Sequence, residues 1–272
     1  MKVLYIAEIV GKAGVYAFKQ ALKELRRRAS WDFLIACADG ATGSGGLGRN
    51  HAAYLAKLGA NVLTTGDFCF YKKDLCDNFD KLPYVLRPYN LNQEAPGSGA
   101  RVYKAGSGKV AVVSLLGQSG FSRLHGSSPH ALLPALLARL RAQTPYVIVD
   151  FHAQASAEKK ALFLAADGLC SAALGSHARV QTADETVLPG GTAIITDAGR
   201  TGAQESVGGC DAASRVREYL SGIPDWTRES WERPEAQGVL VDMGEDGRAR
   251  SIERIRVPVS VDEKDKGGAP AD

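Results

Sequence analysis

Apolar runs and amphipathic segments alternate along the N-terminal part of the chain. Lys2–Ala7, Asp32–Cys37 and Asn61–Thr65 are apolar runs of strand length. Between them, apolar side chains recur at helical spacing from Gly11 to about Arg28, and a second helix is expected near Asn50–Leu58. This strand–helix alternation predicts a largely parallel sheet covered by helices, and so an α/β fold.

The rest of the chain is less regular. Pro83–Gly99 contains three prolines and is expected to be a long connection. The other expected elements are a hairpin of Arg101–Ala105 and Lys109–Leu115, helices at Pro129–Arg141 and Ser156–Ala165, and strands at Tyr146–Asp150, Thr192–Thr196, Gln237–Met243 and Ser251–Val257. We expect one domain over residues 1–258 and a disordered, charged tail over residues 259–272.

Polar side chains end five of the apolar runs. They are Glu8, Asp39, Asp67, His152 and His177, the last of which follows a Gly-Ser turn in the stretch Ala173–Glu185. Because the carboxyl ends of parallel strands meet at one edge, we expect these side chains to converge. Carboxylates and imidazoles are ligands for Mn, Fe, Co or Zn. Each residue alone is explained by helix capping or by a loop hydrogen bond, but all five together favour a metal site.

A glycine-rich stretch offers a competing interpretation. Gly43–Gly48 matches Gly-x-Gly-x-x-Gly between an expected strand and an expected helix, and Asp67 lies near the spacing of a ribose-binding acid. However, five residues separate Cys37 from Gly43, and Asp39 stands where a dinucleotide-binding turn should begin. We therefore favour a flexible loop beside a metal site.

Composition narrows the choice of partner and compartment. The 272 residues are 45% hydrophobic and 23% charged, which is typical of a soluble globular protein. The net charge of +3 gives no strong nucleic-acid signal, and no segment predicts a membrane span or a signal peptide. Five cysteines without a Cys-x-x-Cys pair predict a reduced, cytoplasmic protein. Cys37 and Cys170 are expected in the core, so no thiolate ligand is expected.

Seven segments spread over roughly Met1–Leu220 carry a resemblance to a known family. They are Ile6–Lys12, Thr65–Lys73, Arg87-Pro88, Val149–Ala153, Gly175–Glu185, Gly190–Thr192 and Thr196–Gly199. In these segments the chain resembles the YmdB-like branch of the calcineurin-type metallophosphoesterases. The resemblance implies a β-sandwich flanked by helices in α-β-β-α layers, two metal ions, and hydrolysis of phosphodiesters, including 2′,3′-cyclic nucleotides.

The expected site departs from this family at several positions. The family has Asp at Glu8, Glu-Asn at Asp39-Gly40, Asn-His at Asp67-Phe68 and His-Thr-His at His177-Ala-Arg179, whereas His152 is unchanged. The resemblance assigns one metal to Asp39, Asp67, His152 and His177, all of which can still ligate an ion. It assigns the other metal to Glu8, Asp39, Gly40 and Arg179. Gly40 has no side chain, and Arg179 is a permanent cation that cannot ligate.

We therefore predict one divalent ion, Fe, Mn or Zn, instead of two. Arg179 is expected to replace the second ion, paired with Glu8 and Asp39 or with a phosphate, the alternative being an exposed loop arginine. Phe68 replaces a histidine that would protonate the leaving oxygen or steady the phosphate, so weak activity is expected. His125 and His130 are the candidates to replace that histidine.

Two functions stay open on the sequence alone. One is a weak phosphodiesterase acting on a small phosphodiester or nucleotide, and the other is an inactive relative that binds a ligand or a partner. Residues Trp226–Trp231 form either a partner surface or a cover over the sheet. The sequence leaves the oligomeric state open.

Overall fold

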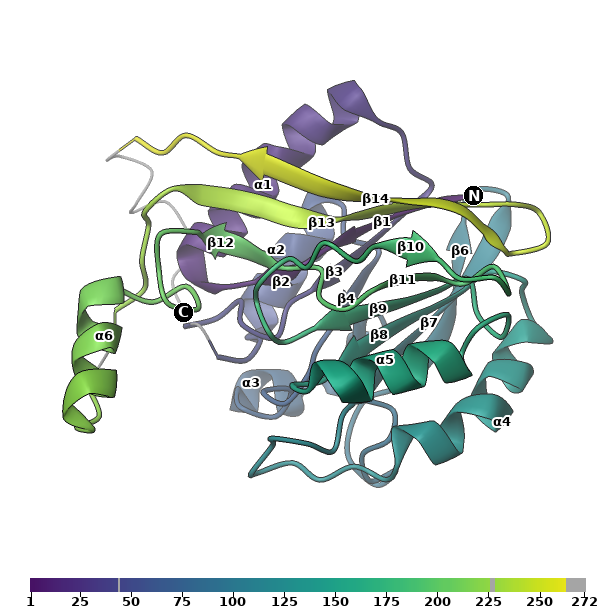
Figure 1. The fold of residues 1–272 in the computed structure, drawn as a ribbon, viewed down its shortest axis with the longest axis horizontal. Coiled ribbons are helices and arrows are strands. Elements are labelled where there is room, and N and C mark those ends of the chain that lie inside the picture. The colour runs from purple at the N-terminus through teal and green to yellow at the C-terminus, as the bar shows by residue number, and fades with distance from the viewer. Residues whose placement is uncertain (44, 226–227, 263–272) are drawn as a thin grey trace.

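The computed structural model describes residues 1–43, 45–225 and 228–262, and it contains two sheets packed face to face (Figure 1). The first sheet has the order β2-β12-β13-β1-β3-β4-β5, with β14 beside β13. Its strands are β1 (Lys2–Ile6), β2 (Glu8–Ile9), β3 (Phe33–Cys37), β4 (Val62–Thr64), β5 (Val85–Leu86), β12 (Arg200–Ala203), β13 (Pro234–Met243) and β14 (Ala249–Pro258). The second sheet, β10-β11-β9-β8-β7-β6, consists of β6 (Ala100–Ala105), β7 (Gly108–Leu116), β8 (Val147–His152), β9 (Ala172–Ser176), β10 (Thr186–Val187) and β11 (Ala193–Ile195).

Helices cover the outer face of each sheet. The helices are α1 (Gly11–Arg28), α2 (Arg49–Leu58), α3 (Lys73–Cys76), the 3-10 turn η1 (Phe79–Lys81), α4 (Pro129–Arg141), α5 (Ser156–Ala165) and α6 (Ala212–Ser221). Apolar side chains of α1 and α2 pack on the first sheet, and those of α4 and α5 pack on the second. None of the helices in the described ranges combines the length and the apolar character needed to cross a bilayer.

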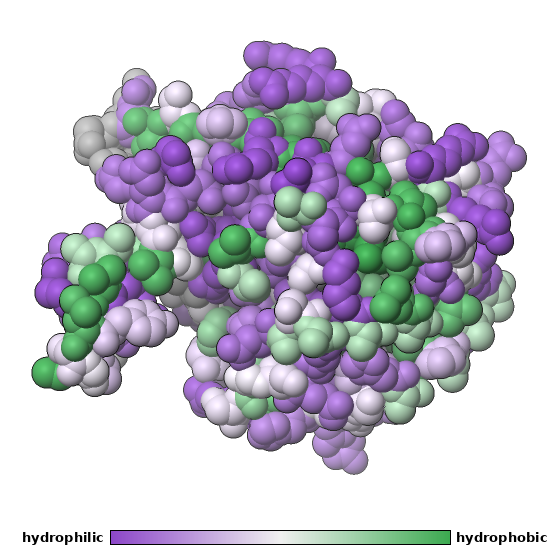
Figure 2. Space-filling model, in the orientation of Figure 1, coloured by the Kyte–Doolittle hydropathy of each residue, from purple (hydrophilic) through white to green (hydrophobic). Residues whose placement is uncertain are grey.

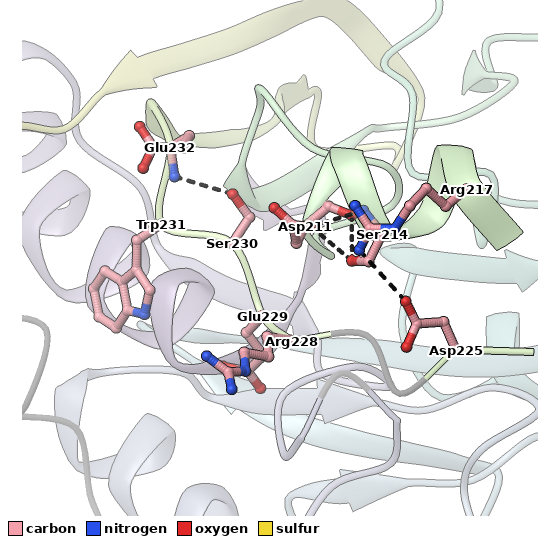
Figure 3. A pocket seen from close by; sticks show the side chains of 9 residues that line it. All are labelled: Asp211, Ser214, Arg217, Asp225, Arg228, Glu229, Ser230, Trp231 and Glu232. Atoms are coloured by element: carbon pink, nitrogen blue, oxygen red, sulfur yellow. Dashed lines mark hydrogen bonds and ion pairs between the residues drawn. The ribbon is translucent and has the colours of Figure 1, made fainter.

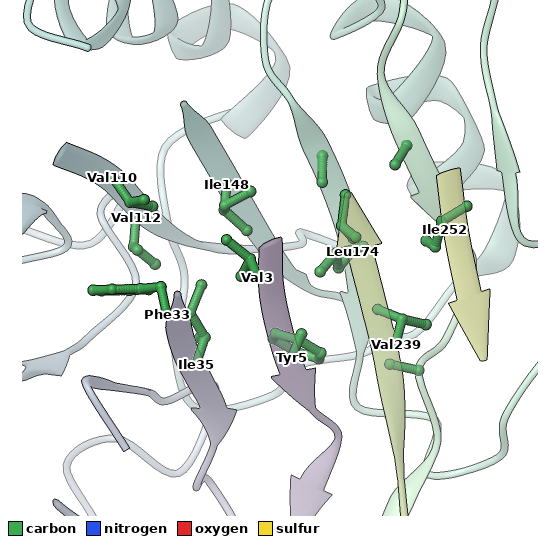
Figure 4. Close-up of a cluster of buried hydrophobic side chains, with 14 of the residues drawn as sticks. Val3, Tyr5, Phe33, Ile35, Val110, Val112, Ile148, Leu174, Val239 and Ile252 are labelled. Atoms are coloured by element: carbon green, nitrogen blue, oxygen red, sulfur yellow. The ribbon is translucent and has the colours of Figure 1, made fainter. Parts of the chain in front are cut away.

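The layers follow from the alternation of side chains along each strand. In β1, Val3 and Tyr5 point toward the second sheet and meet Ile148 and Leu174, whereas Leu4 joins the cluster under α1 and α2 (Figure 4). Both faces of the strand are buried, which explains why it is apolar throughout. The result is the α-β-β-α sandwich that the resemblance implies, and this expectation is confirmed.

The largely parallel sheet predicted from the strand–helix pattern is instead two mixed sheets. β1, β3, β4 and β5 are parallel, as are β7, β8, β9 and β11, but β13 inserts antiparallel between β12 and β1. The hairpin expected at Arg101–Ala105 and Lys109–Leu115 is confirmed as the antiparallel pair β6–β7. Hydrophobic periodicity identifies a strand but not its neighbours. Pairing of the C-terminal strands with the N-terminal one is long-range and leaves no local signal.

The C-terminal part holds two features outside the expected pattern. Helix α6 stands apart from the sandwich and carries exposed apolar side chains, among them Val216, Tyr219 and Leu220 (Figures 1 and 2). Beyond β14, the Val259 N–H donates to the Pro234 carbonyl at 2.9 Å. Most of the predicted tail, residues 263–272, lies outside the described residues.

Candidate metal centre

The five polar residues at the strand ends meet between the two sheets. Glu8 lies in β2, Asp39 follows β3 and Asp67 follows β4, so the first sheet supplies three carboxylates. His152 ends β8 and His177 follows β9, so the second sheet supplies two imidazoles. Their convergence results from two parallel strand groups whose carboxyl ends face the same edge of the sandwich.

His152 is the centre of a dense donor cluster. Its Nε2 lies 2.9 Å from Asp67 Oδ1, 3.1 Å from His177 Nδ1 and 3.6 Å from Asp39 Oδ2. One ring nitrogen carries at most one hydrogen and cannot serve three acceptors. Ligand atoms of Asp67, His152 and His177 all lie within 4.8 Å of one another. Asp39 lies beside this group and not within it. Carboxylate and imidazole donors of this kind suit a divalent ion such as Fe, Mn or Zn.

The surroundings place the cluster between the core and the surface. Asp39 and His152 are almost fully buried, whereas the side chains of Asp67 and His177 are 18% and 25% exposed. The carboxylate of Asp39 accepts hydrogen bonds from the N–H groups of Gly66 (2.6 Å) and Phe68 (3.1 Å). A Cβ atom on Gly66 would lie only 2.2 Å from the His152 ring, so a glycine is required there.

A buried polar relay orients His152. Its Nδ1 lies 3.0 Å from Ser176 Oγ, and Ser176 Oγ donates to Asp150 Oδ1 at 2.7 Å. Thr64 donates to the other oxygen of Asp150. Because the Ser176 proton is committed to Asp150, its oxygen accepts from Nδ1–H. Nε2 is therefore the ring nitrogen that faces the donor cluster, and it can ligate a metal once its proton is displaced.

Burial and mutual charge shift the pKa values in the cluster. Burial lowers the pKa of His152, but the hydrogen bond to Asp67 and the charges of Asp39 and Glu8 raise it to about 9. Burial raises the pKa of Asp39 to about 7, even though the charge of His152 lowers it. These groups therefore hold protons that a cation must displace.

Arg179 and Glu8 form a salt bridge beside Gly40, among the residues to which the resemblance assigns the second ion. Arg179 donates from Nε at 2.9 Å and from Nη2 at 2.7 Å to Glu8 Oε1, and from Nη1 to the Gly208 carbonyl at 2.9 Å. A Cβ atom on Gly40 would lie 3.0 Å from Arg179 Nη2 and 3.1 Å from Glu8 Oε1. The guanidinium thus borders the space that a side chain at Gly40 would enter. Oε2 of Glu8 is buried and has no hydrogen-bond partner among the described residues.

A strained turn carries His177 and Arg179. Both have positive φ angles, 93° and 60°, which are uncommon for residues other than glycine. Asp197 accepts from the N–H of Ala178 at 2.9 Å and from Nζ of Lys159 at 2.8 Å, and the ion pair is 1% exposed on each side. Lys159 is not among the residues predicted from the sequence, although a lysine on the apolar face of a helix indicates a buried ion pair.

Cys37 was expected to be a core residue only. Its Sγ lies within 4.8 Å of ligand atoms of Glu8 and His152, directly beneath the cluster. Burial, followed by the charges of Asp150 and Glu8, raises the pKa of the Cys37 thiol. Cys37 is therefore a neutral thiol as long as no cation binds beside it.

The two histidines proposed to replace the family histidine lie elsewhere. The ring of His130, in α4, is 6.4 Å from that of Phe151. Phe151 and His152 point to opposite faces of β8, so His130 is on the helix-covered side. His125 is exposed and lines a cavity of about 480 Å³ with Tyr89 and Asn90.

The glycine-rich loop lies beside the centre. The Gly46 N–H donates to the Asp39 carbonyl at 2.6 Å, and a Cβ atom on Gly46 would lie 3.0 Å from Cβ of Tyr71. The loop thus packs against the turn that follows Asp67. The loop therefore lies next to the donor cluster.

A cavity of about 640 Å³ lies beside α6, lined by charges of both signs including Arg217, Arg228 and Glu229 (Figure 3). None of the predicted site residues lines it. Trp231 borders it and packs 5.9 Å from the ring of Tyr16 in α1. Trp231 therefore packs against a helix, whereas Trp226 lies outside the described residues.

Several known proteins are similar to this chain in sequence or in fold. The chain is 33% identical over 258 residues to the 2′,3′-cyclic-nucleotide 2′-phosphodiesterase of Bacillus subtilis, and the match covers 94% of this chain and 97% of that relative. The crystal structure of a novel phosphatase from Mycoplasma pneumoniae has a TM-score of 0.88 at 29% identity and covers 95% of this chain and 93% of that one. A hypothetical protein from Thermus thermophilus has a TM-score of 0.87, also at 29% identity, with 95% and 99% covered.

The sandwich and its edge of carboxylates and imidazoles define a calcineurin-like metallophosphoesterase, a hydrolase of phosphoric esters. Within this class, the sequence profile of the YmdB-like proteins matches residues 4–255. The chain belongs to the YmdB-like family.

Proposed function

We propose that this protein hydrolyses phosphodiesters, including 2′,3′-cyclic nucleotides, slowly and with one divalent ion. The observation that carries the proposal is the contrast between two neighbouring positions. Around His152 the donor atoms converge, whereas beside Gly40 the guanidinium of Arg179 is paired with Glu8. The substrate class is taken from the Bacillus subtilis relative.

Asp39, Asp67, His152 and His177 would hold the ion. When bound, a divalent ion here supplies a Lewis acid for a phosphoryl oxygen and lowers the pKa of an attacking water. Fe, Mn and Zn all suit this donor set. The relay through Ser176 and Asp150 keeps the His152 ring in the tautomer that such an ion needs.

Arg179 supplies a fixed positive charge in place of a second ion. Its fork is held by Glu8 and by the Gly208 carbonyl, so little reorientation is needed when a phosphate enters. A fixed cation stabilises the negative charge that develops on the phosphoryl oxygens. It cannot activate a water as an ion does, which predicts low turnover.

Phe68 lowers turnover further. Its N–H holds Asp39 and its ring packs edge-on against Tyr71, with centroids 4.6 Å apart, so it anchors the turn but offers no proton. The leaving oxygen must take its proton from water. Loss of a general acid costs roughly 10²–10⁴ in rate.

Hydrolysis of 2′,3′-cyclic AMP and of bis-p-nitrophenyl phosphate tests the proposal. We expect slow turnover of both substrates, and we expect added Mn²⁺ to increase it. Asp67→Ala and His152→Ala should each abolish both turnover and metal binding. His125→Ala, an exposed histidine, is the matched control and should keep both. Absence of turnover in metal-loaded protein would favour the alternative, an inactive relative that binds a ligand or a partner. The loss of the family side chains at Gly40 and Phe68 supports this alternative. Unchanged metal content in both alanine variants would show that the ligands are misassigned.

A further inference from the structure

An aromatic rim, formed by Phe68, Tyr71, Phe121 and Arg123, borders the candidate metal centre. The ring of Phe121 lies 6.1 Å from that of His152 at an interplanar angle of 21°, and it meets the ring of His177 edge-on at 5.0 Å. Phe121 belongs to the connection between β7 and α4, whereas Phe68 directly follows Asp67. Two segments far apart in the sequence thus bring rings to the same donor cluster.

Arg123 joins the two segments of the rim. Its guanidinium carbon lies 5.0 Å from the centre of the Tyr71 ring, and its Nη1 donates to the Tyr71 hydroxyl at 3.1 Å. Tyr71 in turn holds Phe68 through the edge-on contact. A cation over an aromatic face fixes both groups, so the rim is ordered before a ligand arrives.

The rim is not explained by core packing. Nearby, Cys69, Leu91 and Leu116 form a small hydrophobic cluster, and Phe121 packs against it. Phe68 and Tyr71 belong to none of the hydrophobic clusters found in the described residues. Tyr71 is 44% exposed, and Phe68 and Phe121 are half-buried. Partly wet aromatic faces beside a reaction centre suit a flat ligand group.

We propose that the aromatic rim is the base-binding subsite of this enzyme. The inference rests on the proposed function: with the phosphate held beside Asp67 and His177, the nucleobase of the same molecule stacks on the rim. Every base has a π-face, so this subsite distinguishes nucleotides from base-free phosphate esters and not one base from another. The Phe68 ring offers no proton to the leaving oxygen, but it forms part of the surface on which the base stacks.

Isothermal titration with adenosine 5′-monophosphate and with ribose 5-phosphate, both in the presence of Mn²⁺, tests this subsite. The two probes share the ribose phosphate, and ribose 5-phosphate has a hydroxyl group where the nucleotide has its base. We expect the nucleotide to bind roughly tenfold more tightly. The double variant Tyr71→Leu, Phe121→Leu should bring its affinity to that of ribose 5-phosphate, whose own affinity should not change. Tyr219→Leu, at a ring on α6 that is 78% exposed, is the control and should keep the difference.

Variants that keep an aromatic ring at positions 71 and 121 distinguish loss of stacking from a folding defect. Tyr71→Phe and Phe121→Tyr should preserve the tenfold difference, while the single leucine variants should each reduce it. Equal affinity of the wild-type protein for both probes, binding of neither probe, or an unchanged difference in the double variant would overturn the subsite. Turnover of bis-p-nitrophenyl phosphate is scored separately, so the subsite can fail while the proposed hydrolysis stands.

Discussion

At Gly40 the space for a side chain is limited by Arg179. A Cβ atom there would meet Nη2 of Arg179 at 3.0 Å, Oε1 of Glu8 at 3.1 Å and the carbonyl oxygen of Ile9 at 3.1 Å. An asparagine at this position would have to displace the guanidinium from Glu8. The absence of a side chain at Gly40 therefore leaves room for the guanidinium of Arg179.

Restoring both family residues should restore the second ion. In the double variant Gly40→Asn, Arg179→His, an amide oxygen and an imidazole would join Glu8 and Asp39, so we expect the metal content to rise from one ion per chain to two. Elemental analysis after metal loading measures this. Gly40→Asn alone should gain no metal and should lower the melting temperature, because it crowds Arg179. A single ion in the double variant would mean that Arg179 is not what excludes the second.

A proton donor at Phe68 should raise the rate. Phe68 lies beside Asp67 and its side chain is half-buried, so the imidazole of Phe68→His can approach the leaving oxygen. We expect kcat for 2′,3′-cyclic AMP to rise by roughly 10²-fold, the lower end of what a general acid contributes. Phe68→Leu, which removes the ring without adding a donor, should show no such gain. A rate for Phe68→His no higher than that of Phe68→Leu would count against this account of slow turnover.

At the scale of elements, polar contacts connect the strands under the centre. Thr64 ends β4 in the first sheet, Asp150 and His152 lie in β8, and Ser176 ends β9. The relay through these residues links the two sheets below the donor cluster. It orients a metal ligand and at the same time satisfies a buried carboxylate.

Breaking the relay should weaken metal binding without unfolding the protein. Ser176→Ala removes the group that accepts from Nδ1–H of His152, and loss of such an outer partner costs about 10–100-fold in metal affinity. Competition with a chromophoric chelator measures the change. Ser171→Ala is the matched control, since Ser171 is equally buried next to β9 but bonds to Val147 and Pro145. Equal affinities for the two variants would show that the relay does not position His152.

Asp184 makes the turn after His177 sensitive to acid. Its carboxylate accepts from Thr182 and Thr196 and pairs with Lys160. Partial burial raises the pKa of Asp184, but these hydrogen bonds outweigh burial and hold the pKa well below its usual value. A folded-state pKa below the unfolded value means that the stabilisation is complete above the unfolded pKa of about 4 and is lost as the pH falls below it.

Asp184→Asn should therefore flatten the acid side of the stability profile. We expect the variant to have a lower melting temperature than the wild type near pH 7 and a smaller further loss between about pH 5 and pH 3. Thermal unfolding followed by circular dichroism measures both. Glu94→Gln, at an exposed site, should follow the wild type. Parallel curves for wild type and Asp184→Asn would contradict the assignment.

Across the whole molecule, the sequence predicts which polar side chains converge better than it predicts the sheets. Glu8, Asp39, Asp67, His152 and His177 stand at the ends of apolar runs, and a parallel strand leaves that signal locally. The pairing of β13 with β1 leaves no such local signal, because it depends on contacts between the two ends of the chain. The sandwich was expected only through the family resemblance.

Several supporting residues were missed for a different reason. Asp150 carried a signal, since a charge within an apolar strand must be paired when buried, but its partners Thr64 and Ser176 are ordinary in sequence. Phe121 carried no such signal, because the sequence does not show which residues an aromatic side chain in a long connection will contact. Such contacts exist only once the fold brings distant segments together.

The central claim is that one ion and one arginine share a site built for two ions. Metal content of the full chain, purified without chelator and loaded with Mn²⁺ or Fe²⁺, tests it most directly when turnover of 2′,3′-cyclic AMP is measured on the same sample. The account predicts one ion per chain and slow hydrolysis. Two ions per chain with fast hydrolysis would contradict it.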